Sequence, residues 1–228
     1  PEMVRGSRGA SVTEMFSLGR GEKVVGLFGE AADPIMLVTR NGVAKRIDSD
    51  ALKRLRSGSS AITLKGDDRV NAAFAAGEDS EVVMVASDGQ ALRTPASGIS
   101  VQGPGAGGVV GMKLKPGASL IAAGIVEFGS AVVVVSDEGA IKATDVAEIP
   151  SKGRATGGVR TVKWRDFETT AAFAWVGRSQ QLAAVVSDAV DDKKIDNTPM
   201  PLSLELTRRD GLTANQEGRV LLVGEYRL

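Results

Sequence analysis

The stretch Gly103-Pro104-Gly105-Ala106-Gly107-Gly108-Val109 recurs fifty positions later as Gly153-Arg154-Ala155-Thr156-Gly157-Gly158-Val159. Gly58 precedes the last glycine of the first copy by the same interval. The sixth residue after this glycine is apolar in all three places: Leu64, Leu114 and Trp164. Self-similarity at a period of about fifty residues is typical of supersecondary units that are stacked or arranged radially. The repeat therefore decides the fold class before any single motif is considered.

Tight-turn signals follow an apolar run in each unit. The pairs are 35–39 before Asn41-Gly42, 82–87 before Asp88-Gly89, and 131–136 before Glu138-Gly139. Two-residue hairpin turns require positive φ, which Gly and Asn tolerate. Four short strands are expected in each full unit: 35–39, 43–47, 61–64 and 70–75; then 81–86, 91–93, 109–114 and 119–125; then 131–135, 140–142, 159–164 and 169–176. Partial units are expected at the two ends, with strands near 22–28, 181–188, 201–206 and 219–224.

Strand composition favours a propeller over a sandwich. The run 132–135 consists of four valines, so both of its faces should be covered by protein. No segment has helical periodicity over the length of a core helix. Circular closure protects the many strand edges that short antiparallel sheets would expose. We expect an all-β, propeller-like domain over residues 1–228, with about five four-stranded blades, the terminal ones partial or shared. The repeat units are about 1–30, 31–77, 78–128, 129–178 and 179–228.

Missing residue types exclude most enzyme classes. The chain of 228 residues contains neither Cys nor His. Disulfides, thiolate chemistry, Ser-His-Asp catalysis and His-ligated zinc are therefore absent. We expect no catalytic residue and no metal site. The apolar runs are far shorter than the roughly 20 residues that cross a bilayer, and no leader pattern opens the chain, so a cytoplasmic location is expected.

Charge is balanced overall but clustered locally, with 28 basic and 28 acidic residues. Residues 40–56 and 139–165 each hold six basic residues against two acidic ones. The glycine-rich segments 53–58 and 151–158 lie within or beside these clusters, and segment 102–108 is their counterpart in the third unit. Backbone amides in such loops approach phosphates closely, and neighbouring cations add attraction. The alternatives are that the charges are solvated strand ends and that the glycines only allow the chain to cross between blades.

One motif match is excluded by its surroundings. Residues 103–108 satisfy the G-x-G-x-x-G pattern of dinucleotide sites. That chemistry requires a helix N-terminus directly after the glycines. A strand is expected there instead, so the segment is not a nucleotide site.

A family resemblance follows from residues 38–46 and from Lys152-Gly153-Arg154-Ala155-Thr156-Gly157-Gly158-Val159-Arg160. Both resemble the C-terminal domain of the A subunit of bacterial type IIA topoisomerases, which are DNA gyrase and topoisomerase IV. The resemblance extends over nearly the whole chain, with turn and glycine loop in register over three repeats. It implies a β-pinwheel, a propeller-like disc whose blades exchange strands. It also implies binding and bending of duplex DNA around a basic rim, which presents a transport segment to the cleavage core.

The N-terminal residues favour the topoisomerase IV branch. Gyrase carries a glutamine-, arginine- and glycine-containing box in its first blade, and the equivalent place here is residues 3–9. Arg5, Gly6, Arg8 and Gly9 fit this box, whereas Met3, Val4 and Ser7 do not. Residues 208–211 also resemble the topoisomerase IV branch. Decatenation and relaxation are therefore expected; the alternatives are gyrase-type wrapping for negative supercoiling, and a protein-interaction propeller with no DNA role.

The resemblance also supplies site and partner expectations. The expected DNA contacts are Arg5, Arg8, Arg40, Lys45, Arg46, Arg54, Arg56, Arg93, Lys142, Lys152, Arg154 and Arg160. The domain itself is expected to bind no cofactor, because the parent complex would use ATP and Mg²⁺ through other domains. Its expected partners are duplex DNA, the ATPase subunit of the parent heterotetramer and the cleavage core of its own subunit, near the nucleoid.

Overall fold

The fold is nearly all-β, as predicted. The computed structural model describes residue 16 and residues 18–27, 32–179, 182–187, 200–215 and 218–225. The strands are β1 (Ile35–Thr39), β2 (Val43–Ile47), β3 (Val70–Ala75), β4 (Glu81–Ala86), β5 (Gln90–Pro95), β6 (Val109–Val110), β7 (Leu120–Ile125), β8 (Ser130–Ser136), β9 (Ile141–Asp145), β10 (Val159–Arg160), β11 (Ala171–Arg178), β12 (Leu182–Ser187), β13 (Met200–Pro201) and β14 (Arg219–Glu225). The helical elements are α2 (Ser49–Lys53) and two 3₁₀ turns, η1 (Ala96–Gly98) and η2 (Val146–Glu148).

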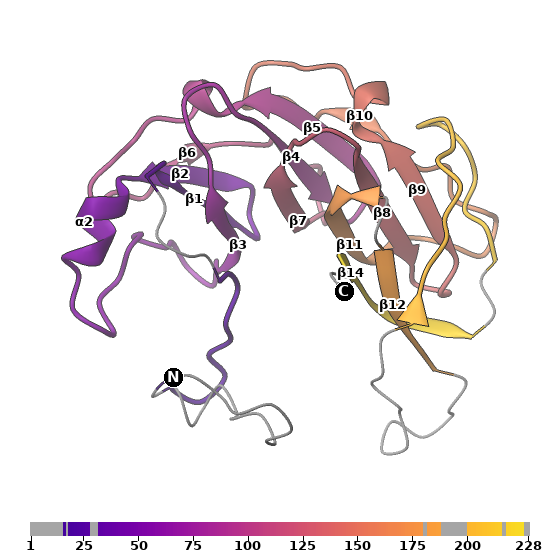
Figure 1. The fold of residues 1–228 in the computed structure, drawn as a ribbon, viewed down its shortest axis with the longest axis horizontal. Coiled ribbons are helices and arrows are strands. Elements are labelled where there is room, and N and C mark those ends of the chain that lie inside the picture. The colour runs from indigo at the N-terminus through magenta and orange to yellow at the C-terminus, as the bar shows by residue number, and fades with distance from the viewer. Residues whose placement is uncertain are drawn as a thin grey trace.

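Four antiparallel sheets follow one another along the chain. Their strand orders are β3-β1-β2-β6, β10-β5-β4-β7, β11-β8-β9 and β13-β12-β14. In each of the first three sheets a hairpin of two consecutive strands carries a third strand on its inner side. The inner strands β3, β7, β11 and β14 contact one another in that order, and the four sheets lie along an arc (Figure 1). Of the partial unit expected at residues 1–30, the described residues 18–27 form no strand, so the strand expected near 22–28 is wrong over residues 22–27; most of the unit lies outside the described residues.

The outer strand of a sheet comes from the next unit. Strand β6 follows β5 in the sequence but pairs with β2 of the first sheet, where Val43 lies opposite Val110. Strand β10 follows β9 but pairs with β5 of the second sheet, where Ala91 lies opposite Val159. The exchange of strands between blades, which the family resemblance implied, is therefore confirmed.

This exchange corrects the strands expected at the glycine loops. Residues 61–64 form no strand, and only the first two residues of 109–114 and of 159–164 are strands. These two residues also complete the preceding sheet rather than their own. The apolar pattern of a segment shows that it is partly buried but not which sheet edge its backbone pairs with.

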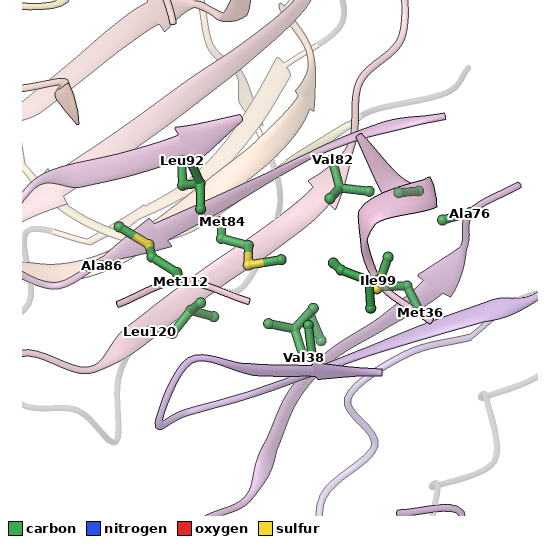
Figure 2. Packing of buried hydrophobic residues seen from close by; sticks show 13 residues of the cluster. Met36, Val38, Ala76, Val82, Met84, Ala86, Leu92, Ile99, Met112 and Leu120 are labelled. Atoms are coloured by element: carbon green, nitrogen blue, oxygen red, sulfur yellow. The ribbon is translucent and has the colours of Figure 1, made fainter. Parts of the chain in front are cut away.

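The core lies between successive sheets. Met36 and Val38 of the first sheet face Met84 and Leu92 of the second, with Met112 beside them (Figure 2). Strand β8 is buried on both faces, as its four valines predicted. Val132 and Val134 pack toward the second sheet, whereas the alternate valines pack toward the fourth. Successive strand residues point to opposite faces, so one strand can serve two cores.

Hairpin turns at equivalent places fix the register of the repeat. Gly42, Gly89 and Gly139 have φ of +79°, +79° and +83°. Residues with a Cβ rarely adopt this left-handed region. The connections are three residues long rather than the two expected (40–42, 87–89 and 137–139), and each ends with its glycine in the left-handed position that such loops require. Within the described residues, no helix has the length and apolar character needed to cross a membrane.

Candidate nucleic-acid interface

Three crossing loops run along the outer edges of the first three sheets. We define loop 1 as residues 102–108, loop 2 as residues 152–158 and loop 3 as residues 207–213. Each loop begins beside an isolated parallel bridge: Arg46 with Val101, Arg93 with Ser151, and Ala143 with Leu206. Each loop ends beside an antiparallel pair: Ala44 with Val109, Ala91 with Val159, and Ile141 with Ala214. The three loops therefore occupy equivalent places on successive blades.

Each crossing loop also accepts a backbone hydrogen bond from an equivalent position of the preceding repeat. The backbone N–H groups of Thr63, Lys113 and Lys163 donate to the carbonyls of Ala106, Thr156 and Gly211 at 3.2, 3.0 and 2.8 Å, respectively. These bonds place Lys113 and Lys163 beside loops 2 and 3, and both residues are exposed. The loops and these neighbouring residues together form the outer rim of the domain.

Loop 2 and its surroundings carry exposed cations. Lys152, Arg154, Arg160 and Lys113 are all exposed, and within the described part of the chain none of them is ion-paired. Arg154 donates from Nε to the carbonyl of Gly98 at 2.8 Å and from Nη1 to that of Val110 at 3.2 Å. Since carbonyl groups carry no net charge, they orient the guanidinium without neutralising it. The outer edge of the second sheet is consequently a positive patch.

A second group of exposed cations follows helix α2. The Asp48 carboxylate caps this helix by accepting from the N–H groups of Asp50 and Ala51, both at 3.0 Å. Arg54 and Arg56 lie directly after the helix and are exposed. The fifty-residue repeat makes segment 53–58 the counterpart of the crossing loops. The equivalent glycines Gly58, Gly108 and Gly158 all have a left-handed φ, of +82°, +81° and +73°.

Three of the predicted contacts are buried, so their prediction as rim residues is wrong. Lys45, Arg46 and Lys142 have exposed fractions of 0%, 3% and 4%. Arg46 donates to the carbonyl of Ile99 at 2.6 Å and pairs with Glu78 at 2.8 Å. Lys142 donates to the hydroxyl of Thr144. Long side chains on strands can lie beneath a crossing loop, and the sequence did not show that these strands are covered.

Lys45 is held by the crossing loop that covers it. Its ammonium donates to the carbonyls of Ala61, Gly103, Pro104 and Ala106 at 2.8, 2.6, 3.0 and 3.0 Å. Burial lowers the pKa of Lys45. The residue therefore fixes loop 1 to β2 from beneath.

Arg40 and Arg93 are partly buried in ion pairs. Arg40 lies 2.7 Å from Asp67 and lowers the pKa of that carboxyl by hydrogen bonding and by its charge. Arg93 pairs with Glu81. Burial alone would raise the pKa of Glu81, but hydrogen bonds from Arg93 and Ser151 outweigh it, and the pKa is lowered. Both arginines are thus largely neutralised. Arg5 and Arg8 lie outside the described residues.

Sequence reasoning missed several rim cations. Lys113 and Lys163 occupy the position of Thr63 in successive repeats, which the fifty-residue register could have revealed. Arg208 of loop 3 is highly exposed and lies 3.6 Å from Asp210, and Arg209 donates to the carbonyl of Arg160 at 3.3 Å. The interface thus extends from loop 2 to loop 3.

The structure agrees with the exclusion of a dinucleotide site. Strand β6 and not a helix follows loop 1, so the G-x-G-x-x-G pattern is no nucleotide site. Trp164 and Trp175 pack against the second and third core clusters.

Comparison with known proteins agrees with this geometry. The family model described as "DNA gyrase C-terminal domain, beta-propeller" matches residues 33–76, 80–127 and 131–167, more than half of the chain. The DNA gyrase A protein of Escherichia coli (strain K12) is 30% identical over 169 residues, which are 72% of this chain and 19% of that protein. The chain thus spans about a fifth of the length of this relative.

Solved structures share the fold. The C-terminal domain of DNA topoisomerase IV superposes with a TM-score of 0.79 at 21% identity, over 95% of this chain and 70% of the other. The DNA gyrase A C-terminal domain superposes with a TM-score of 0.73 at 18% identity, over 98% of this chain and 76% of the other. From the matched repeats and the strand exchange together, we conclude that the chain belongs to the family of DNA gyrase C-terminal domains with the β-propeller fold.

Proposed function

We propose that this domain is a non-catalytic part of the A protein of a type IIA topoisomerase and that it binds and bends duplex DNA along its outer rim. The observation that carries this proposal is the set of exposed, unpaired cations at loop 2, among the described residues: Lys113, Lys152, Arg154 and Arg160. Duplex DNA carries one negative charge per roughly 1.7 Å of its axis, so a row of such cations on a convex edge suits its backbone. Base edges need not be read, and binding is expected to be independent of sequence.

In the parent enzyme, the bent DNA would be presented as the transport segment for decatenation and relaxation. Its protein partners would be the ATPase subunit and the cleavage core that belongs to the same chain as this domain. The enzyme would act in the cytoplasm. ATP and Mg²⁺ would bind to those other domains, since the crossing loops offer cations and amides for anions rather than ligands for a metal. A topology assay on the intact enzyme with and without this domain separates decatenation from supercoiling. Loss of supercoiling alone on deletion would favour the gyrase alternative.

The test of DNA binding is a titration of the domain with short duplex DNA at several salt concentrations. The variant Arg154→Glu/Arg160→Glu reverses two cations at the rim. Because each phosphate contact contributes about 0.9 to the slope of log K against log salt, the variant should bind more weakly and with a shallower slope, lower by roughly two contacts.

A matched control is Arg20→Glu/Lys23→Glu. These two residues are exposed within residues 18–27, which lie against the inner side of the first sheet because Gly26 contacts Ala73 of β3. The control changes the net charge equally but should lower affinity much less. Equal losses in the two variants would show that binding follows net charge and not the rim.

A further inference from the structure

Loop 1 differs from loop 2 in where its positive charge lies. Loop 2 carries Lys152 and Arg154 on its surface, and the residue of the second sheet that corresponds to Lys45 is the buried Leu92. Loop 1 carries Gln102 and Pro104 at the corresponding places, and Lys45 is buried beneath it. The unit that lacks surface cations therefore has an ammonium group in its interior.

The hydrogen bonds of Lys45 determine which way the peptide groups of loop 1 face. The carbonyls of Pro104 and Ala106 point inward to the ammonium, each at 3.0 Å. In a trans peptide the N–H points opposite to the C=O, so the N–H groups of Gly105 and Gly107 point outward. Neither N–H finds an acceptor among the described residues.

The outer side of loop 1 is open to a ligand. Gly103, Gly105 and Gly107 are exposed, and a Cβ built on Gly103 or Gly105 would meet no atom within 4 Å. Backbone N–H groups that face outward without an acceptor suit an anion. The charge of Lys45 lies behind the N–H groups of Gly105 and Gly107, where the carbonyl groups orient it but do not cancel it.

We propose that loop 1 is a phosphate-binding subsite of the rim, in which the N–H groups of Gly105 and Gly107 donate to a phosphate of the DNA backbone. Lys45 acts as a positioning residue: it turns the loop peptides outward and supplies positive potential from beneath. This inference rests on the proposed DNA-binding function. It extends the DNA path from loop 2 to the first blade, although loop 1 has no cationic side chain of its own.

The first experiment follows the ¹H–¹⁵N resonances of the domain during titration with short duplex DNA at low salt. The amide protons of Gly105 and Gly107 should move downfield together with resonances of loop 2. Shifts in loop 2 without shifts in loop 1 would overturn this inference and leave the proposed function intact. Unchanged spectra throughout would overturn both.

A pair of variants tests the donor itself. Gly105→Pro removes the N–H, whereas Gly105→Ala keeps it and adds a Cβ in open space. Since the loss of one charge-assisted hydrogen bond at an exposed rim weakens binding only moderately, the proline variant should bind DNA roughly three- to tenfold more weakly. The alanine variant should bind as the unmodified domain does. Equal affinities of the two variants would contradict the proposal.

Lys45→Met separates the positioning role from simple folding. It should abolish the DNA-induced shifts of Gly105 and Gly107 while those of loop 2 persist, which also shows that the rest of the domain is folded. If the loop 1 shifts persist without the ammonium, Lys45 does not position the subsite.

Discussion

Lys142 and Lys45 are both buried strand lysines beneath crossing loops, yet replacing each of them with leucine should change the stability of the domain in opposite directions. Lys142 has a pKa lowered from 10.5 to about 8, because burial removes its ammonium from water; the charges of Asp210 and Glu148 only partly offset this. At about 1.4 kcal/mol per pKa unit, this charged group costs the folded domain about 3 kcal/mol at neutral pH. Leucine removes that cost, and the equivalent residue of the second sheet is already the buried Leu92.

Thr144 tolerates this change because it keeps a partner. Its hydroxyl also donates to the carbonyl of Thr161 at 3.2 Å. We therefore expect Lys142→Leu to stabilise the domain by about 1–3 kcal/mol at pH 7. The pKa of Lys142 is lower in the folded than in the unfolded chain, so the unfolded chain binds more protons between about pH 8 and 10.5. The stability of the unmodified domain should rise across this window, and the advantage of the variant should shrink.

Lys45→Leu should instead destabilise the domain. The carbonyls of Gly103 and Ala106 keep backbone donors, Ala106 and Thr63. The carbonyls of Ala61 and Pro104 lose their donor and stay without one among the described residues. At about 1–3 kcal/mol for each unsatisfied group, partly relieved by water at the loop, the loss should be about 2–4 kcal/mol.

The measurement is urea-induced unfolding of the variants at pH 7 and pH 10. Lys163→Leu, at an exposed position, is the control and should change stability by no more than about 0.5 kcal/mol. The reasoning would be refuted if Lys142→Leu lost as much stability as Lys45→Leu. Parallel pH dependence of the unmodified domain and Lys142→Leu would refute it equally.

Two further predictions concern the attachment of the crossing loops. Gly158→Ala should destabilise the domain by about 3 kcal/mol or more in thermal unfolding, because φ at this residue is +73° and the added Cβ would lie 2.2 Å from the carbonyl oxygen of Ala91. The control Gly153→Ala should leave the stability nearly unchanged, because its added Cβ would meet no atom within 4 Å. Glu168→Gln should cost about 1–2 kcal/mol, because the buried carboxylate accepts from the Thr213 hydroxyl at 2.8 and 2.9 Å and from the N–H of Arg165 at 2.8 Å. An unchanged urea midpoint in Gly158→Ala would show that position 158 does not require a glycine. An unchanged midpoint in Glu168→Gln would show that the hydrogen bonds of Glu168 do not contribute to stability.

The hairpins of this domain were predictable from local sequence. The bounds of β1, β2 and β3 match the expected segments because apolar runs, turn glycines and strand propensity all act within a few residues. The partner of Val109–Val110 was not predictable in this way. Val109–Val110 pair with β2 because loop 1 crosses from the second blade to the first. The path of this loop is set by tertiary contacts and not by the local sequence.

The candidate interface was predicted in part for a related reason. Arg154 and Lys152 could be placed on the rim because they belong to a glycine-rich loop that must be exposed. Lys45 and Lys142 alternate with residues that face the core, and each was counted as surface charge because lysine is usually exposed. What covers them is the crossing loop of another unit, more than fifty residues further along the chain.

Strand exchange also has a consequence for synthesis on the ribosome. The first sheet lacks its outer strand until Val110 has emerged, and the second lacks its own until Arg160 has emerged. An emerging unit therefore exposes the backbone edge of β2 or β5 while its successor is being translated. We therefore expect each blade to receive its outer strand only once the next unit begins to emerge, so that the blades assemble in the order of translation.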